Sequence, residues 1–355
     1  MLAAVVEARF ELHEPDGAFA ALERFLAAEG FWGRRGVAAD LYLGYGLSGP
    51  LRRTAHPAPP EPCPLPLLAC RIRPDPPPRA QAGGAAGGYS LGGWERSWDD
   101  EGYAAAIEAV RAAIARGDVY QVNLVQHLSA PFEGAPAAPA RALAALRPLV
   151  PRPFAGDGWA VVSASPELFL ARRGRRLATR PIKGTRPAGQ EVRSEKDSAE
   201  HVMIVDLERN DLARVCEPGS VRWPELGRQR ELAGVAHLES TVEGTLREGA
   251  GLAEILAATF PGGSVTGAPK VAALDLIAAL EPVGRGASMG ALGVVRPDGD
   301  FDLALTIRTF AVAEGRIHLW VGGGIVWDSD PEAEIEESWV KARPLLAALG
   351  ALQPA

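Results

Sequence analysis

The chain has 355 residues, 47% of them hydrophobic and 23% charged, with a formal net charge of −7 at pH 7. This composition is typical of a globular enzyme and is large enough for one or two hydrophobic cores. Charged residues, Pro or Gly interrupt every apolar stretch before the roughly 18 to 20 residues that a membrane span needs, which excludes a membrane protein. The acidic balance, without a basic stripe, argues against nucleic acid as a partner.

The amino-terminal stretch and the cysteines indicate the cellular compartment. The opening segment, MLAAVVEARFELHE, has no basic region before its apolar residues, so it does not have the pattern of a secretory signal. Cys63, Cys70 and Cys216 are too few and too irregularly spaced for a disulfide framework or a zinc site. We therefore expect a cytoplasmic protein.

The early part of the chain predicts a small subdomain and a linker. Residues 1–55 mix short apolar stretches with glycine, which predicts a few strands and one helix over 19–29. Ten prolines follow between Pro57 and Pro78, and small residues fill 80–88. Because proline disfavours a helix or a central strand, this Pro/Gly-rich segment is predicted to be a linker.

The linker divides the chain into an N-terminal subdomain over residues 1–95 and a second domain over 96–355. The second domain begins with an amphipathic helix over about 100–116, which Gly117 ends. The later patterns predict a hairpin at 173–174, a helix over 195–215, a three-stranded meander over 289–324 and a helix over 332–349 that Asp330 caps. Strand meanders between helices favour an α+β fold with antiparallel sheets.

Lysine is rare, and its positions are informative. Of the 37 basic residues only four are lysine, at 183, 196, 270 and 341. Only lysine offers a compact ammonium that can become a neutral nucleophile. Lys183, before Gly184, is either a solvated loop cation or a nucleophile, which would need desolvation or a nearby cation. Glu167 is either a structural carboxylate or a half-buried general acid. His237 is either an interior histidine or a catalytic one.

Two further patterns suggest binding of charged groups. The C-terminal helix places Glu334, Glu337 and Lys341 on one face, either as a solvated stripe or as a Mg²⁺ site completed by an acid such as Glu200. The segment FPGGSVTGAPK lacks the lysine spacing of a nucleotide loop, because Lys270 comes three residues after the last glycine. It predicts a glycine turn before a helix, which either binds a carboxylate or forms a plain cap.

Together, these segments resemble the chorismate-utilising enzymes, which include the first components of anthranilate synthase and aminodeoxychorismate synthase and the isochorismate synthases. The matching stretches cover about 250 residues and are GDVYQVNL, SPELFL, TRPIKGT, EHVMIVDLERNDL, VCEPGSV, FPGGSVTGAPK, ALTIRT and GGGIVWDSDPEAEIEESWVKA. The resemblance implies an α+β fold in which two antiparallel sheets form a sandwich-like core flanked by helices. It also makes 96–355 a chorismate-binding catalytic domain.

The resemblance implies the chemistry. At this position the resemblance gives aminodeoxychorismate synthases the sequence PIKGT and anthranilate synthases the sequence PIAGT. Lys183 therefore favours an aminodeoxychorismate synthase. It implies that this lysine attacks C2 of chorismate, that Glu167 protonates the departing C4 hydroxyl, and that ammonia then displaces the lysine. At the position of Gln121, isochorismate-forming relatives carry a lysine that activates water, which glutamine cannot do.

The resemblance also implies the binding residues. Glu200 and Glu337, with Glu334 nearby, match the ligands of a Mg²⁺ ion that holds the ring carboxylate, and Lys341 pairs with that carboxylate. The residues matched to substrate binding are Thr185, His237, Ser264, Arg308, Gln121 and the glycines Gly322, Gly323 and Gly324. Two departures are Ser288, where relatives carry a tyrosine, and a short N-terminal part without a tryptophan-feedback motif.

The sequence therefore predicts a Mg²⁺-dependent aminodeoxychorismate synthase component I that serves the route to 4-aminobenzoate and folate. Its partners would be chorismate and a glutamine amidotransferase subunit that supplies ammonia, because no cysteine has the context of a glutaminase nucleophile. The alternatives are anthranilate synthase component I, isochorismate synthase and, in another class, a non-catalytic chorismate-binding subunit.

Overall fold

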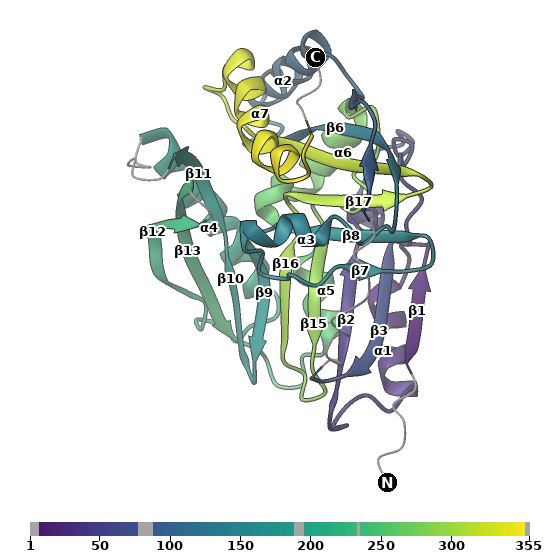
Figure 1. Cartoon of the computed structure of the whole chain (residues 1–355). Coiled ribbons are helices and arrows are strands. Elements are labelled where there is room, and N and C mark those ends of the chain that lie inside the picture. Colours follow the sequence, from purple (N-terminus) through teal and green to yellow (C-terminus); the bar gives the residue numbers. More distant parts are fainter. Residues whose placement is uncertain (1–6, 77–87, 188–194, 233–234, 352–355) are drawn as a thin grey trace.

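The computed structural model describes residues 7–76, 88–187, 195–232 and 235–351. Side chains of residues 185–187, 195–200, 231–232 and 235–236 lie outside this description. The described strands form two sheets, and every strand pair in them is antiparallel, as the sequence predicts. Figure 1 shows the strands of the smaller sheet running crosswise over those of the larger one.

The larger sheet has ten strands, with β1, β3 and β2 at one side and β13, β11 and β12 at the other. Its spatial order is β1-β3-β2-β15-β16-β9-β10-β13-β11, and β12 also pairs with β13. The strands are β1 (Ala8–Leu12), β2 (Val37–Leu43), β3 (Leu68–Pro74), β9 (Leu168–Arg173), β10 (Arg176–Arg180), β11 (Ile182–Pro187), β12 (Arg222–Leu232), β13 (Val235–Thr245), β15 (Ala291–Val295) and β16 (Phe301–Leu305).

The smaller sheet has eight strands in the order β14-β6-β18-β17-β8-β7, and β4 and β5 pair with β6. Its longest pair, β6 with β18, keeps its register from Pro131 opposite Arg316 to Val122 opposite Ile325. The strands are β4 (Ser90–Leu91), β5 (Glu95–Arg96), β6 (Gln121–Glu133), β7 (Phe154–Ala155), β8 (Trp159–Ser163), β14 (Gly267–Ala268), β17 (Thr309–Ala313) and β18 (Arg316–Ile325).

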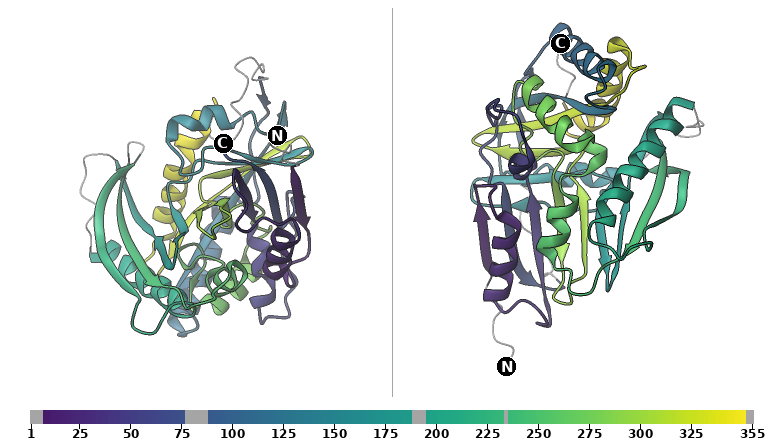
Figure 2. Two further views of the ribbon diagram at one scale, coloured as in Figure 1. Left: turned by 90° about the horizontal axis from the view of Figure 1, so that it is seen from below. Right: turned by 180° about the vertical axis from the view of Figure 1, so that it is seen from behind.

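Helices cover the outer faces of both sheets. Behind the larger sheet lie the purple helix α1 (Ala18–Ala28) and the green helix α5 (Leu252–Thr259), which Figure 2 shows from that side. Helix α7 (Pro331–Ala348) packs on β18 of the smaller sheet. The other helices are α2 (Asp100–Ala115), α3 (Ala140–Leu143), α4 (Glu195–Ala213), α6 (Lys270–Leu280) and the 3₁₀ turns η1 (Tyr45–Leu51), η2 (Ala144–Leu146) and η3 (Gly263–Val265).

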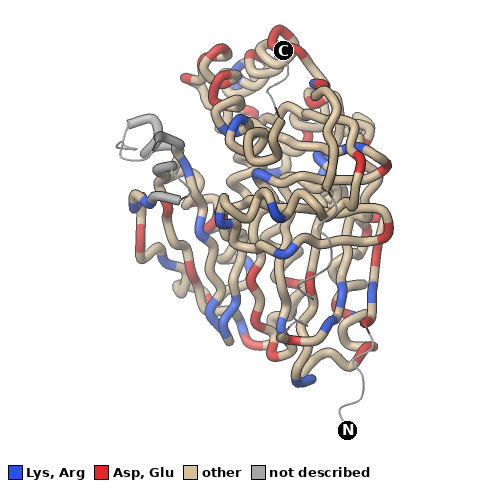
Figure 3. Tube along the Cα trace, viewed as in Figure 1, with Lys and Arg blue, Asp and Glu red and all other residues tan. Residues whose placement is uncertain are grey.

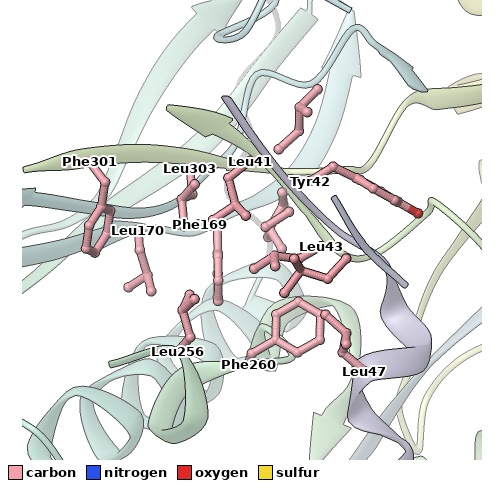
Figure 4. Close-up of a cluster of buried hydrophobic side chains, with 14 of the residues drawn as sticks. Leu41, Tyr42, Leu43, Leu47, Phe169, Leu170, Leu256, Phe260, Phe301 and Leu303 are labelled. Carbon is pink, nitrogen blue, oxygen red and sulfur yellow. The ribbon is translucent and has the colours of Figure 1, made fainter. Parts of the chain in front are cut away.

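The alternation of side chains along β8 divides them between two of the three hydrophobic cores. On β8, Trp159 and Val161 join the core of the larger sheet, whereas Ala160 and Val162 face the core under α7. Figure 4 shows the core of the larger sheet, in which Phe169 points from the sheet toward Leu256 of α5. All seven residues of β2 are buried, which shows that both faces of the sheet are covered at this strand.

The proline-rich segment is not wholly a linker, and the expectation of no central strand was wrong. Strand β3 is a central strand, because it pairs with β1 on one side and β2 on the other. The stretch between Pro66 and Pro74 contains no proline, so its amides remain free to donate to the neighbouring strands. The N-terminal strands therefore share a sheet with β15; a domain boundary at residue 95 stays a prediction.

The expected three-stranded meander is also corrected. The segment FDLALTIRTFAVA forms two strands, β16 in the larger sheet and β17 in the smaller one. The break lies at Arg308, whose φ of 50° is incompatible with an extended strand. Alternating hydrophobicity continues on both sides of this residue, which is why the pattern alone predicts one strand.

Other local expectations are confirmed. The Asp330 carboxylate accepts a hydrogen bond from the Ala333 amide and Pro331 is the first residue of α7, as the capping pattern predicts. None of the helices in the described ranges is long and apolar enough to cross a bilayer. Figure 3 shows basic and acidic residues interspersed along the strands of the larger sheet.

Candidate active site

Two chain segments pass from one sheet to the other side by side. One joins β8 to β9 and carries Glu167, and the other joins β16 to β17 and carries Arg308. The Leu305 amide donates to the carbonyl of Glu167 at 3.0 Å, and the Ala164 amide donates to the carbonyl of Arg308 at 2.9 Å. The crossing therefore holds an acid and a guanidinium at the junction of the two sheets.

A cavity of about 220 Å³ opens at this junction. Most of the residues predicted from the sequence border it, and they come from both sheets, both crossing segments, η3 and α7. The predicted residues around the cavity are Glu167, Lys183, His237, Ser264, Arg308, Gly322, Gly323, Gly324, Glu334, Glu337 and Lys341. Segments more than 150 residues apart in sequence thus converge on one pocket.

Glu167 is suited to donate a proton near neutral pH. Its side chain is 4% exposed, and burial raises its pKa from 4.5 to about 7. The Ser264 hydroxyl donates to Oε1 at 2.9 Å, and this bond together with the charges of Lys183 and Arg308 limits the rise. A carboxyl with this pKa is substantially protonated at neutral pH, as a general acid must be.

Lys183 lies on β11, which pairs with β13 and positions the lysine at the cavity. The next residue, Gly184, has a φ of 67°, a conformation that glycine adopts without strain. The register of β11 shifts directly after Lys183. The sequence shows only that Lys183 precedes a glycine. The structure adds that Lys183 borders the same cavity as Glu167.

His237 is held as a neutral imidazole. Its Nδ1 lies 2.9 Å from the carbonyl oxygen of Gly184, which can only accept, so Nδ1 carries the proton. Its Nε2 then accepts from the Arg308 guanidinium at 3.4 Å. Burial and the charge of Arg308 lower the pKa of His237 to about 4. His237 thus links the Lys183 turn to Arg308.

The glycine triplet on β18 allows α7 to approach the sheet. A side chain at Gly323 would place its Cβ 3.3 Å from Lys341 Nζ and 3.4 Å from Glu334 Oε2. Lys341 Nζ donates to the carbonyl of Gly322 at 2.8 Å and lies 2.8 Å from Glu337 Oε1. The carboxylates and the ammonium of α7 therefore meet the strand backbone where a side chain would separate them.

The predicted Mg²⁺ ligands are described only in part. Glu334 is 7% exposed and borders the cavity together with Glu337, so two carboxylates are available on one side. Such hard oxygen donors suit Mg²⁺, which commonly takes one or two protein carboxylates. The side chains of Glu200 and Thr185 lie outside the described residues. No group of three metal-binding side chains occurs among the side chains that are described.

The family of the chain follows from a sequence comparison. A model of the chorismate binding enzymes matches residues 78–347, which is most of the chain. The chain belongs to the chorismate-binding enzyme family. The match includes every residue that the sequence singles out for the site.

Curated relatives carry two different names. The chain is 46% identical over 280 residues to anthranilate synthase component 1 of Thermus thermophilus, covering 74% of this chain and 60% of that protein. It is 40% identical over 283 residues to aminodeoxychorismate synthase component 1 of Klebsiella aerogenes, covering 75% of this chain and 62% of that protein. The chain thus spans less than two thirds of these relatives.

Solved structures support the fold of this chorismate-binding enzyme. Anthranilate synthase component I from Streptococcus pneumoniae TIGR4 superposes with a TM-score of 0.78 at 22% identity, covering 97% of this chain and 93% of that one. MenF, the menaquinone-specific isochorismate synthase from Escherichia coli, gives 0.71 at 19% identity, covering 96% and 84%. At these identities the likeness concerns the fold alone.

Two predicted positions in this chorismate-binding enzyme do not border the cavity. Gln121 is 1% exposed and pairs through its backbone with Ala268 on β14, whereas Asn123, two residues on along β6, borders the cavity. Ser288 is fully buried, and its neighbour Met289, with a φ of 62°, borders the cavity instead. Ser288, where the resemblance leads us to expect a tyrosine, therefore does not line the pocket.

The sequence gives no role to several residues that support the site. Arg285 and Glu281 form a buried ion pair at 2.7 Å, and Arg285 also donates to the carbonyls of Asn123 and Val265. Both carbonyls belong to residues that border the cavity. The spacing of Glu281 and Arg285 by four residues was a possible signal, but their burial and their contacts with β6 and η3 are tertiary.

Proposed function

We propose that this chain is an aminodeoxychorismate synthase component I, which converts chorismate and ammonia to 4-amino-4-deoxychorismate on the route to 4-aminobenzoate and folate. The observation that carries the proposal is the presence of Lys183 and the buried acid Glu167 at one cavity. In the proposed covalent route, a nucleophilic amine and a protonated carboxyl are the two groups that together replace the hydroxyl by nitrogen.

In the proposed reaction, the Lys183 amine forms a bond to C2 of chorismate as the C4–oxygen bond breaks. Glu167 transfers its proton to the departing hydroxyl, which leaves as water. Ammonia then forms a bond to C4 and the C2–lysine bond breaks, so that Lys183 returns to the free amine, and a proton lost from the new C4 ammonium restores the acid form of Glu167. Its raised pKa lets Glu167 hold its proton until the hydroxyl leaves.

Positive groups at the cavity would hold the two carboxylates of chorismate. The Arg308 guanidinium is mostly buried beside His237, and buried guanidinium groups bind carboxylates strongly. Lys341 offers a second positive group, an ammonium at the glycine triplet. Together with Glu200, the carboxylates of Glu334 and Glu337 would hold Mg²⁺, which when bound would supply a positive charge for the ring carboxylate.

The ammonia would come from a glutamine amidotransferase subunit. All three cysteines are buried, and burial raises the thiol pKa of Cys63 and Cys70 to about 12 and of Cys216 to about 11. Such thiols are poor nucleophiles, so the chain would not hydrolyse glutamine itself. We expect turnover with ammonium salts, and turnover with glutamine only after a glutaminase is added.

One incubation tests the proposal. Purified protein with chorismate, Mg²⁺ and an ammonium salt should yield 4-amino-4-deoxychorismate by liquid chromatography and mass spectrometry, and the same mixture without ammonium should not. Without ammonium, the intact protein should gain the mass of chorismate less one water, and Lys183→Arg should not. Arginine keeps the positive charge but cannot become a neutral amine, which makes it the matched control.

Anthranilate synthase component I is the second candidate, because the Thermus thermophilus relative of that name is 46% identical. It predicts a fluorescent anthranilate product from the same ammonium-containing mixture. An isochorismate synthase predicts product without ammonium, and a non-catalytic binding subunit predicts chorismate binding without any product. Each outcome other than aminodeoxychorismate would refute the proposed function.

A further inference from the structure

Asparagine is rare in this chain, and one of its two copies is buried at the cavity. The chain has asparagine only at positions 123 and 210. Asn123 lies on β6, is 6% exposed and borders the cavity, whereas Asn210 is exposed on α4. Strands disfavour asparagine, and a buried carboxamide costs free energy unless its polar atoms are hydrogen-bonded. The place of Asn123 in a buried strand therefore indicates a partner for its side chain.

The carboxamide of Asn123 uses little of its hydrogen-bonding capacity within the protein. A carboxamide offers two N–H donors and an oxygen that accepts. The Nδ2 of Asn123 contacts the sulfur of Met289 at 4.0 Å, and a thioether is a weak acceptor. Within the described residues, the Oδ1 of Asn123 accepts no hydrogen bond. Because buried polar groups are nearly always paired, these atoms point to a ligand group that enters the cavity.

The backbone around Asn123 is fixed by buried contacts. Its amide donates to the carbonyl of Thr266 at 2.9 Å, and its carbonyl accepts from Arg285 Nη2 at 2.6 Å. Arg285 pairs with Glu281, and Glu281 Oε1 also accepts from the amide of Val125, two residues farther along β6. The same ion pair thus holds β6 at both residues. A side chain on such a fixed strand loses little conformational freedom when it binds a ligand.

The contacts of Asn123 lead to the elements that hold Glu167 and Arg308. Met289, which its Nδ2 contacts, donates through its amide to the carbonyl of Thr306 at 3.2 Å, two residues before Arg308. The turn η3, which donates to Glu167, ends directly before the residue that accepts from the Asn123 amide. Asn123 is therefore tied to the part of the cavity where the acid and the guanidinium lie on adjacent crossing segments.

The order of groups around the chorismate ring indicates which of them reaches this part of the cavity. Chorismate carries one carboxylate on C1, an enolpyruvyl ether with the second carboxylate on C3, and the hydroxyl on C4. In the proposed reaction Glu167 protonates the C4 hydroxyl, so the neighbouring C3 substituent lies closest to the acid and to Arg308. The ring carboxylate lies beside C2, which Lys183 attacks. A carboxylate accepts up to about four hydrogen bonds, so the Arg308 guanidinium leaves room for a neutral donor.

We propose that Asn123 is a substrate-binding residue whose Nδ2 donates a hydrogen bond to the enolpyruvyl carboxylate, next to Arg308. The inference rests on the proposed function, because the position of the C3 substituent is taken from the proposed reaction. Asparagine suits this place because its carboxamide is neutral and adds no second cation beside the guanidinium. A hydrogen bond to a charged group is stronger than one between neutral groups. Asn123 thus contributes to affinity for chorismate and to the preference for a substrate that carries this carboxylate.

The first test observes Asn123 directly in the unmodified protein by NMR. With ¹⁵N at the asparagine side-chain amides, only two pairs of signals arise, and Asn210→Asp assigns them. One probe is 3-(carboxymethoxy)benzoate, which carries both carboxylates in the 1,3 arrangement of chorismate, and the other is 3-methoxybenzoate, which lacks the side-chain carboxylate. The first probe should move the Asn123 amide protons to lower field, and the second should not. No movement with the first probe, or equal movement with both, would overturn the inference.

The second test measures affinity in variants. Asn123→Leu keeps the branched shape but neither donates nor accepts, so calorimetry should show binding of 3-(carboxymethoxy)benzoate weakened by about 10- to 100-fold and binding of 3-methoxybenzoate unchanged. KM for chorismate should rise, and KM for ammonium should stay constant. Asn210→Leu on α4 is the matched control and should change no affinity. If Asn123→Leu does not fold, Asn123→Asp keeps the shape, and its missing donor and added negative charge should weaken the first probe at least as much.

Two results in these variants would contradict the assignment. Equal weakening of both probes would show that Asn123 only supports the pocket, and a rise confined to KM for ammonium would assign it to ammonia instead. Either result would overturn the inference. Absence of aminodeoxychorismate from the unmodified protein would refute the proposed function alone, because the measurements with the two probes involve no turnover.

Discussion

Replacing Glu167 by glutamine should remove the acid of the site and at the same time stabilise the protein at neutral pH. The pKa of Glu167 rises from 4.5 to about 7 on folding, so the folded state binds more protons than the unfolded chain between these values. The unfolding free energy of the protein therefore falls as the pH rises from 4.5 to about 7. At 1.36 kcal/mol per pKa unit, the ionised buried carboxylate costs about 3 kcal/mol above pH 7.

Glutamine retains an oxygen that can accept the Ser264 hydroxyl bond but carries no charge. The difference in unfolding free energy between Glu167→Gln and the unmodified protein should therefore increase by about 3 kcal/mol from pH 4.5 to pH 7.5. A constant offset from the new amide does not affect this slope. The value of kcat should fall by about 10² to 10⁴.

Urea unfolding with linear extrapolation, repeated across this pH range, measures the difference. The control is Glu29→Gln at the exposed end of α1, for which the difference in unfolding free energy from the unmodified protein should not change with pH. A difference for Glu167→Gln that does not change with pH would show that the buried carboxyl is not the cause, and the assignment of an acid with a raised pKa would be withdrawn.

Three other changes should have distinct effects. Lys183→Ala should abolish aminodeoxychorismate formation while chorismate still binds, as measured by product analysis and isothermal calorimetry; full activity would exclude the covalent route. Gly323→Ala should raise KM for chorismate and the Mg²⁺ requirement, because its Cβ meets the α7 charges, whereas Gly93→Ala, in open space, should change neither. Arg285→Met should lower the unfolding free energy, measured with urea, by about 3 to 5 kcal/mol, because Glu281 is left buried and unpaired. Adding Glu281→Gln should restore part of this free energy. If the losses of the two substitutions simply add, this explanation is wrong.

Local signals in the sequence predicted much of the fold. The predicted cap and first proline of α7 are confirmed, and so are the antiparallel sheets. These features depend on residues close together in the sequence. Strand β3 was missed because the prolines around it outweighed the proline-free stretch within it. The break at Arg308 was missed because a single residue with positive φ leaves the hydrophobic pattern intact.

The candidate site was accessible from the sequence mainly through its resemblance to a family. Apart from the rarity of lysine in this chain, nothing local distinguishes Lys183 or Glu167 from ordinary surface or structural residues, because their meeting depends on contacts between distant strands. Lys270 is similar: its partner Asp211 is 59 residues away, and only the fold brings the two together. The pairing of Ser264 with Glu208 is equally tertiary.

The residues that border the cavity are divided between the two sheets and the segments that cross from one sheet to the other. Lys183 and His237 lie on the larger sheet, whereas the glycine triplet lies on the smaller one, and Glu167 and Arg308 lie on the segments between them. A small displacement of one sheet relative to the other would separate these side chains, while the hydrogen bonds within each sheet would remain. In rising denaturant, turnover should accordingly vanish before the circular dichroism of the strands changes.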